Sequence, residues 1–193
     1  TSQLIDLSNE NFHHKWFGNQ DIPVILAIGR LTSQKNFPLL LNAFSLLLEI
    51  HDARLVILGE GKLKSNLEDL AINLNIGEKV SFPGFVTNPF KWMKNASIFV
   101  LSSDYEGLPG TLIQAMACGT PVAAINCLGG PSEVIKNNFN GILTPLENYS
   151  LSIYKYFSDP TNQIKIKKNA IQTVLNDYSL KNTYAALQKS IND

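Results

Sequence analysis

From residue 23 onward, the sequence alternates short apolar runs with longer segments whose apolar residues have helical spacing. The first apolar run covers residues 24–28 and stops at Gly29, which fits a strand buried on both faces. Residues 37–50 follow, with apolar side chains three or four positions apart, as on one face of a helix. Repetition of this strand–helix unit predicts right-handed crossovers and a mainly parallel sheet.

The alternation continues as far as residue 145. We predict six strands, at residues 24–28, 54–58, 79–82, 97–101, 121–125 and 141–143. The helices predicted between them cover residues 37–50, 63–74, 89–94 and 111–117, with a single helical turn at residues 131–135. The expected fold class is therefore α/β, a Rossmann-like, doubly wound parallel sheet of about six strands flanked by helices.

Two parts of the chain lie outside this pattern. Residues 1–22 are polar and lack strong periodicity, and we predict that they form a linker or approach segment, with an aromatic cluster at Phe12, Trp16 and Phe17. Residues 23–193 form the predicted domain, in which residues 145–193 are a helical extension. One helix of the extension should open at Asp159, and another should be capped by Ser179. This last helix would carry Leu180, Tyr184, Leu187 and Ile191.

Composition excludes several classes of function. The chain has 16 basic and 16 acidic residues, so no overall field attracts nucleic acid or an anionic membrane. Cys118 and Cys127 form no CxxC pattern, which disfavours a disulfide framework or structural zinc and favours a reducing compartment. His13, His14 and His51 have no spacing typical of a metal site or a catalytic triad. We therefore expect a cytoplasmic protein without a metal.

In a doubly wound sheet, ligands bind outside the carboxyl ends of the strands. This rule selects the loops at residues 29–36, 59–62, 84–87 and 102–111. In the first loop, Arg30 and Lys35 follow Gly29 and precede a helix. Arginine can hold phosphate oxygens with two parallel hydrogen bonds, and lysine supplies a mobile point charge. The loop therefore suits an anion, although both residues would also be ordinary as solvated loop cations.

The fourth loop ends in a helix start that also suits an anion. Its residues 107–111 have the sequence GLPGT, and exposed amides and the positive end of the helix dipole attract anions without a metal. The alternative is a tight turn with an ordinary cap. Glu106 lies at the mouth of this loop, where we expect it to accept hydrogen bonds from sugar hydroxyls rather than to face an anion unpaired. A third glycine-rich turn, at residues 128–133, is weak evidence alone.

Together these segments resemble the family 4 glycosyltransferases of the GT-B fold. The resemblance covers about residues 23–145 and rests on IGRLTSQKN, LGEGKLKSNLEDLA, VSFPGFV, SSDYEGLPGTLIQAMACGTPV and GGPSEVI followed by NGIL. Each segment alone would be suggestive, and all five in this order and spacing are highly specific. The resemblance implies that the chain is the carboxy-terminal, donor-binding half of a two-domain retaining enzyme.

The resemblance also implies roles for individual residues. Arg30 and Lys35, next to Gly29, would neutralise the donor diphosphate in place of a divalent metal, so no cofactor is expected. Glu106 resembles the first carboxylate of the family's E-x7-E signature, which lies beside the donor sugar. The main chain of one loop would contact the nucleobase, through Gly84, Phe85 and Val86. The main chain of another would contact the donor phosphate or sugar, through Gly107, Leu108, Pro109, Gly110 and Thr111.

One position departs from the family pattern. The second glutamate of the signature is replaced by Gln114, where the family residue usually accepts hydrogen bonds from the ribose hydroxyls. Glutamine keeps one carbonyl acceptor but loses the charge, and charge-assisted hydrogen bonds are stronger by roughly 1 kcal/mol. Nucleotide binding should survive in weakened form, unless Gln114 is a neutral helix residue that faces elsewhere.

The implied function is transfer of a sugar from a nucleotide-sugar, UDP- or GDP-linked, to an acceptor hydroxyl in polysaccharide, lipopolysaccharide or glycolipid synthesis. The acceptor would be held by an amino-terminal domain outside this sequence, so the chain alone should bind donor without transferring sugar. We expect no nucleic-acid partner, and any peripheral attachment to the inner face of the membrane would come through that other domain.

Two alternatives to this function stay open. Gln114 favours a catalytically silent nucleotide-sugar-binding module, whereas Glu106 and its loop argue against a GT-B-like nucleotide-sugar epimerase.

Overall fold

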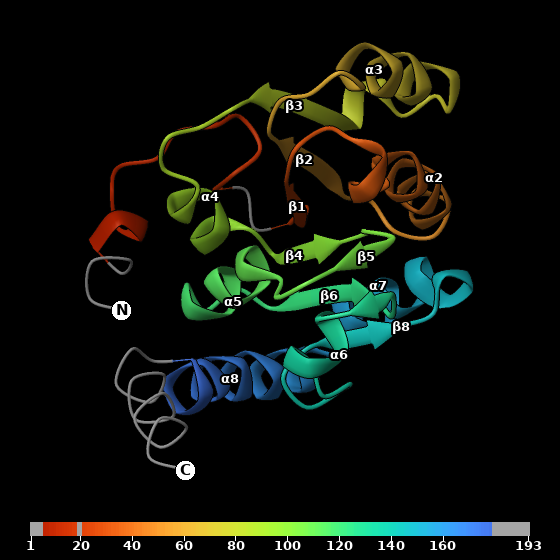
Figure 1. Ribbon diagram of the computed structural model, residues 1–193. Coiled ribbons are helices and arrows are strands. Elements are labelled where there is room, and N and C mark those ends of the chain that lie inside the picture. The colour runs from red at the N-terminus through yellow and green to blue at the C-terminus, as the bar shows by residue number, and fades with distance from the viewer. Residues whose placement is uncertain (1–5, 19–20, 179–193) are drawn as a thin grey trace.

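The computed structural model describes residues 6–18 and 21–178, and at its centre lies a six-stranded parallel sheet (Figure 1). The strands lie in the order β3-β2-β1-β4-β6-β8. They are β1 (Val24–Ile28), β2 (Arg54–Leu58), β3 (Val80–Gly84), β4 (Ile98–Leu101), β6 (Val122–Ile125) and β8 (Ile142–Thr144). The chain builds outward from β1 in one direction and from β4 in the other, so the topological switch point lies between these two strands. The expected fold class is confirmed.

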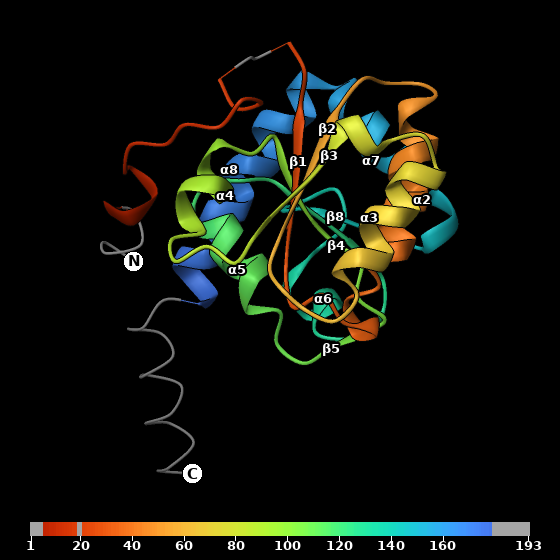
Figure 2. The same cartoon turned by 90° about the horizontal axis from the view of Figure 1, so that it is seen from above.

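Helices cover both faces of the sheet (Figure 2). One face packs against α2 (Phe37–Leu48), α3 (Lys64–Asn73) and α7 (Tyr149–Phe157). The other packs against α4 (Phe90–Asn95), α5 (Gly110–Ala117), α6 (Pro131–Val134) and α8 (Pro160–Asp177). Successive strand residues face opposite ways, so Ile25 joins the first core cluster and Leu26 the second. This two-sided burial is why the β1 segment is apolar without interruption.

All six predicted strands and the helices between them are present, with ends displaced by at most two residues. The third strand continues past its predicted end because Gly84 still pairs with Leu58 of β2. Asp159 opens α8 as expected, since its carboxylate accepts a hydrogen bond from the Asn162 amide at 3.0 Å. Three short 3₁₀ turns, at Ser33–Lys35, Gly77–Lys79 and Leu146–Asn148, were not predicted. The helix predicted after Ser179 lies outside the described residues.

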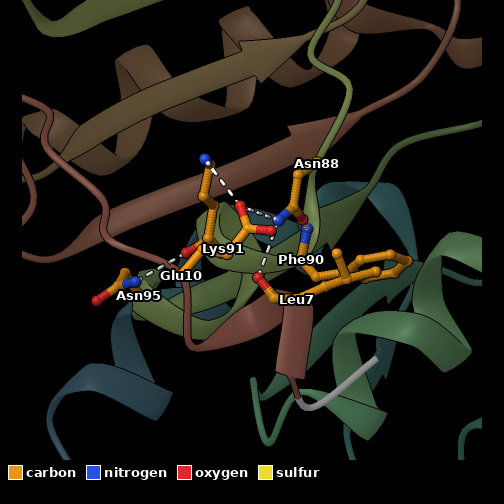
Figure 3. A network of polar contacts seen from close by, with 6 residues as sticks. All are labelled: Leu7, Glu10, Asn88, Phe90, Lys91 and Asn95. Atoms are coloured by element: carbon orange, nitrogen blue, oxygen red, sulfur yellow. Dashed lines mark hydrogen bonds and ion pairs between the residues drawn. The ribbon is translucent and has the colours of Figure 1, made fainter. Parts of the chain in front are cut away.

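Residues 6–18 pack against α4 through a polar network and an aromatic cluster. The Asn88 side-chain amide donates to the Leu7 carbonyl oxygen and to Glu10 Oε2, both at 2.9 Å (Figure 3). Lys91 Nζ lies 3.4 Å from the same Glu10 oxygen. The hydrogen bond from Asn88, followed by that from Lys91, lowers the pKa of the Glu10 carboxyl. The segment predicted as a linker therefore has specific contacts with the domain.

Among the described residues, no helix has the length and hydropathy needed to cross a membrane.

The aromatic cluster contains a histidine whose protonation should loosen the segment. The His14 ring lies 5.2 Å from the Trp92 ring and 5.5 Å from the Trp16 ring, and His14 Nδ1 accepts a hydrogen bond from the Trp16 amide at 3.3 Å. Burial, followed by the charge of Lys15, lowers the pKa of His14 from its ordinary value of about 6.5. A protonated ring would also lose the Nδ1 acceptor.

Because the pKa of His14 is lowered on folding, its contribution to stability is complete above about pH 6.5 and is lost as the pH falls through the lower folded value. We expect the tryptophan fluorescence of the chain to change with a midpoint below about pH 6.5 as residues 6–18 loosen. His14→Gln should remove this transition, whereas His13→Gln at the exposed neighbouring position should retain it. An unchanged transition in His14→Gln would assign the titration to another group.

Candidate functional site

The loops selected by the sequence lie together at the carboxyl edge of the sheet. The loops after β1 and β4 are adjacent because these strands are neighbours, with Ile25 paired to Ile98. They therefore flank the switch point, where ligands bind in this class of sheet.

An ion pair joins these two loops. Lys35 Nζ lies 2.6 Å from Glu106 Oε1, and the Ser103 hydroxyl donates to the same oxygen at 2.6 Å. Both charged side chains are largely withdrawn from water, with exposed fractions of 17% for Lys35 and 9% for Glu106. The aliphatic stem of Lys35 lies over Gly29, where an added Cβ would be 3.2 Å from Lys35 Cε. Lys35 and Glu106 were each predicted from the sequence as site residues, but their pairing was not.

A second set of contacts holds the same two loops in register. The Asn36 side-chain amide donates to Asp104 Oδ1 at 2.6 Å, and the Gln34 amide donates to the Tyr105 carbonyl oxygen at 3.2 Å. Asn36 has the left-handed backbone angle φ 44°, which ends the Ser33–Lys35 turn, and its side chain caps α2. The positions of Lys35 and Glu106 are thus fixed by their neighbours as well as by their own contact.

Arg30 is placed differently from Lys35. Its side chain is exposed, and it makes no ion pair or hydrogen bond with the part of the chain that the structure describes. It lines a cavity of about 290 Å³ at the ends of β1, β2 and β3. The guanidinium is therefore available to an anion at the mouth of that cavity.

The walls of this cavity are mainly apolar. They are formed by Ile28, Gly29, Arg30, Leu58, Gly59, Glu60, Phe85, Val86 and Pro89. Phe85 is 70% exposed, which is unusual for a large apolar side chain and leaves its ring free to pack against a ligand. The structure brings the predicted residues Phe85 and Val86 together with Gly29 and Arg30. Glu60 and Pro89 were not predicted individually as site residues, although the loop at residues 59–62 was predicted as a whole.

The predicted anion loop, residues 107–111, is held by the third glycine-rich turn. Two-residue strands β5 (Tyr105–Glu106) and β7 (Leu128–Gly129) pair in parallel, and the Gly130 amide donates to the Glu106 carbonyl oxygen at 3.2 Å. A Cβ on Gly130 would lie 1.7 Å from the Gly107 carbonyl oxygen. Of the predicted loop residues, Gly107, Leu108 and Gly110 are exposed and Pro109 is buried, while Thr111 is half-buried in the first turn of α5.

Gln114 lies one turn further along α5 and is half-buried. Its side-chain amide makes no hydrogen bond with the described residues, so its polar atoms are available to a ligand.

The two cysteine thiols are not reactive groups of this site. Burial raises the pKa of the Cys118 thiol to about 11, and burial also raises the pKa of Cys127. Neither thiol is therefore suited to act as a nucleophile near neutral pH. In residues 6–18 and 21–178, histidine, cysteine and carboxylate side chains do not gather in any group of three that could hold a metal ion.

Comparison with known proteins identifies relatives with this architecture. A profile of the family described as "Glycosyl transferases group 1" matches residues 8–173. An uncharacterised glycosyltransferase of Methanocaldococcus jannaschii is 37% identical over 177 residues, which cover 89% of this chain and 45% of the relative. The N-acetylgalactosamine-N,N'-diacetylbacillosaminyl-diphospho-undecaprenol 4-alpha-N-acetylgalactosaminyltransferase of Campylobacter jejuni is 39% identical over 124 residues, which cover 64% of this chain and 33% of the relative.

A solved structure supports the same assignment. A single-residue mutant of TarM from S. aureus, in complex with fondaparinux, alpha-GlcNAc-glycerol and UDP, superposes with a TM-score of 0.82 at 25% identity. The aligned region covers 94% of this chain and 37% of TarM. The chain thus spans between a third and a half of the length of these three proteins.

Proposed function

The chain belongs to the group 1 glycosyl transferases, and we propose that it is the donor-binding half of a retaining family 4 enzyme. The observation that carries this proposal is the convergence of Arg30, Lys35 and Glu106 at the switch point of the sheet, beside a cavity with apolar walls. Two cations, a carboxylate and an apolar slot are the groups that a sugar joined to a nucleoside diphosphate requires.

Each part of a nucleotide-sugar donor can be assigned to a group of residues at the carboxyl edge of the sheet. The nucleobase would occupy the cavity of about 290 Å³, against Phe85 and Val86. The diphosphate would lie between Arg30, Lys35 and the amino-terminal end of α5, where amides and the helix dipole favour negative charge. These groups stabilise the charge that develops on the diphosphate as it leaves, so the proposed reaction needs no metal. Glu106 would accept hydrogen bonds from the donor sugar.

The relatives support the finer points of the proposal. The TarM structure contains UDP, which favours a uridine donor for this chain. The names of the Campylobacter enzyme and of the TarM ligand both include an alpha linkage, and an alpha product formed from an alpha-linked nucleotide-sugar means retention. The acceptor named for the Campylobacter enzyme is linked to diphospho-undecaprenol, which favours a role in cell-surface glycan assembly. We further propose a cytoplasmic site of action, with the acceptor held by an amino-terminal domain.

Gln114 supports a second candidate, a silent module that binds nucleotide-sugar without transferring it. A neutral amide leaves one carbonyl acceptor for the ribose in place of a carboxylate, which weakens that contact without abolishing it. Lys35→Ala and Glu106→Gln in the complete enzyme would separate the candidates, because a silent module has binding to lose but no activity.

The direct test is calorimetric titration of the chain with UDP, GDP, ADP and their common sugar conjugates. We expect saturable binding of one nucleotide class and no sugar transfer by this chain alone. Lys35→Ala should weaken binding about ten- to a hundredfold, because a charge-assisted hydrogen bond is worth about 1.5–3 kcal/mol. Lys165→Ala, at an exposed position of α8 outside the selected loops, is the matched control and should bind as the parent does. No binding by any nucleotide would overturn the proposal.

A further inference from the structure

The donor diphosphate would need Lys35 as a cation, but Lys35 already forms an ion pair with Glu106. Glu106 Oε1 lies 2.6 Å from Lys35 Nζ, a distance typical of a strong, charge-assisted hydrogen bond. Ser103 holds the same carboxylate oxygen, so Glu106 is fixed where it meets Lys35. Arg30 has no such partner among the described residues and can meet a phosphate without breaking a contact.

A free nucleoside diphosphate would therefore bind at a cost. To engage Lys35, its phosphate must displace the carboxylate of Glu106, whose side chain is only 9% exposed. Glu106 would be left as a poorly hydrated negative charge, without its cation and close to an anion. The hydrogen bonds between Asn36 and Asp104 and between Gln34 and Tyr105 keep the two loops together, so Glu106 cannot retreat far.

A sugar on the diphosphate changes this balance. Its hydroxyl groups are hydrogen-bond donors, and donors to the carboxylate replace the partner that Glu106 loses when Lys35 turns to the phosphate. The donor thus satisfies both members of the broken pair, whereas the nucleotide product satisfies only one of them.

We propose that Glu106 makes this site select the sugar-bearing donor over the free nucleoside diphosphate, by recapturing Lys35 whenever no sugar is present. The inference rests on the proposed function, since it assigns a further role to a residue of the same site. Once the sugar has been transferred, Glu106 loses its sugar hydroxyls and competes with the phosphate for Lys35. The ion pair therefore favours release of the free nucleoside diphosphate after sugar transfer. It also disfavours binding of this nucleotide from solution.

The experiment compares the affinities of UDP with those of UDP-glucose, UDP-galactose and UDP-N-acetylglucosamine by calorimetry. In the parent chain, the best UDP-sugar should bind at least about tenfold more tightly than UDP. Glu106→Gln should bind UDP about tenfold more tightly than the parent, because Lys35 is released from its counter-ion. The same variant should bind the UDP-sugar no more tightly than the parent, so the preference for the sugar should largely vanish.

Asp69→Asn is the control, because it removes one negative charge at an exposed position of α3, outside the loops that carry Lys35 and Glu106. It should keep the parent's preference to within about twofold. Thermal unfolding of each variant checks that the fold persists. Glu106→Ala is a second variant that lacks the carboxylate. If both Glu106 variants weaken UDP and UDP-sugar equally, or if Asp69→Asn reproduces their effect, the inference is wrong while the donor site stands. If the parent binds no nucleotide, the proposed function itself fails.

Discussion

Gly130→Ala is expected to weaken donor binding strongly while leaving the main sheet folded. An alanine Cβ at this position would lie 1.7 Å from the Gly107 carbonyl oxygen and 2.5 Å from Pro109 Cδ, and backbone cannot yield as a flexible side chain can. Residues 107–110 would have to shift until the first distance reached at least 3.0 Å. This shift removes the loop and the start of α5 from the proposed diphosphate position.

We expect the nucleotide affinity of Gly130→Ala to fall about ten- to a hundredfold, since a lost hydrogen bond to a charged group costs about 1.5–3 kcal/mol. The sheet should survive because β5 and β7, two residues each, lie outside it. Calorimetry with UDP-sugar and far-UV circular dichroism would measure the two outcomes separately. Gly77→Ala is the control, because its added Cβ would have only an ordinary contact at 3.6 Å with Ile72, remote from the site. Near-normal binding by Gly130→Ala would mean that residues 107–111 do not hold the donor.

The main sheet could be predicted from the sequence because its signals are local. Residues 24–28 and 54–58 are short apolar runs followed by glycine, and each became a strand with the predicted bounds. The rule that ligands bind at the carboxyl edge then selected the loops that the structure brings together. Local periodicity and one topological rule were sufficient for this part.

The contacts within the site could not be predicted in the same way. Lys35 and Glu106 are 71 residues apart, and their pairing depends on β1 and β4 being neighbours, which no local pattern specifies. Strands β5 and β7 are too short to show periodicity, so the turn containing Gly130 gave only a weak signal. Residues 6–18 lack periodicity as well, because their contacts with α4 come from single side chains such as Glu10 and Phe12.

Helix α7 was predicted only as part of a helical extension, yet Tyr149 at its first position fills the core. Its side chain is fully buried, and its hydroxyl lies 3.2 Å from the Leu101 carbonyl oxygen and 3.4 Å from that of Ala123. Burial raises the pKa of this phenol, so it stays protonated and can donate at any ordinary pH. Leu101 is the last residue of β4, from which the loop carrying Glu106 departs.

Tyr149→Ala is expected to lower the free energy of unfolding by about 3–5 kcal/mol, because it leaves a cavity where an aromatic ring filled the core. Tyr149→Phe keeps the ring and loses only the hydroxyl, so its cost should be about 1 kcal/mol. Urea denaturation measures both, provided that the slope with denaturant stays constant. Leu151→Ala on the exposed side of the same helix should change stability by less than about 0.5 kcal/mol. A loss for Tyr149→Ala no larger than that of Leu151→Ala would show that α7 does not anchor the carboxyl end of β4.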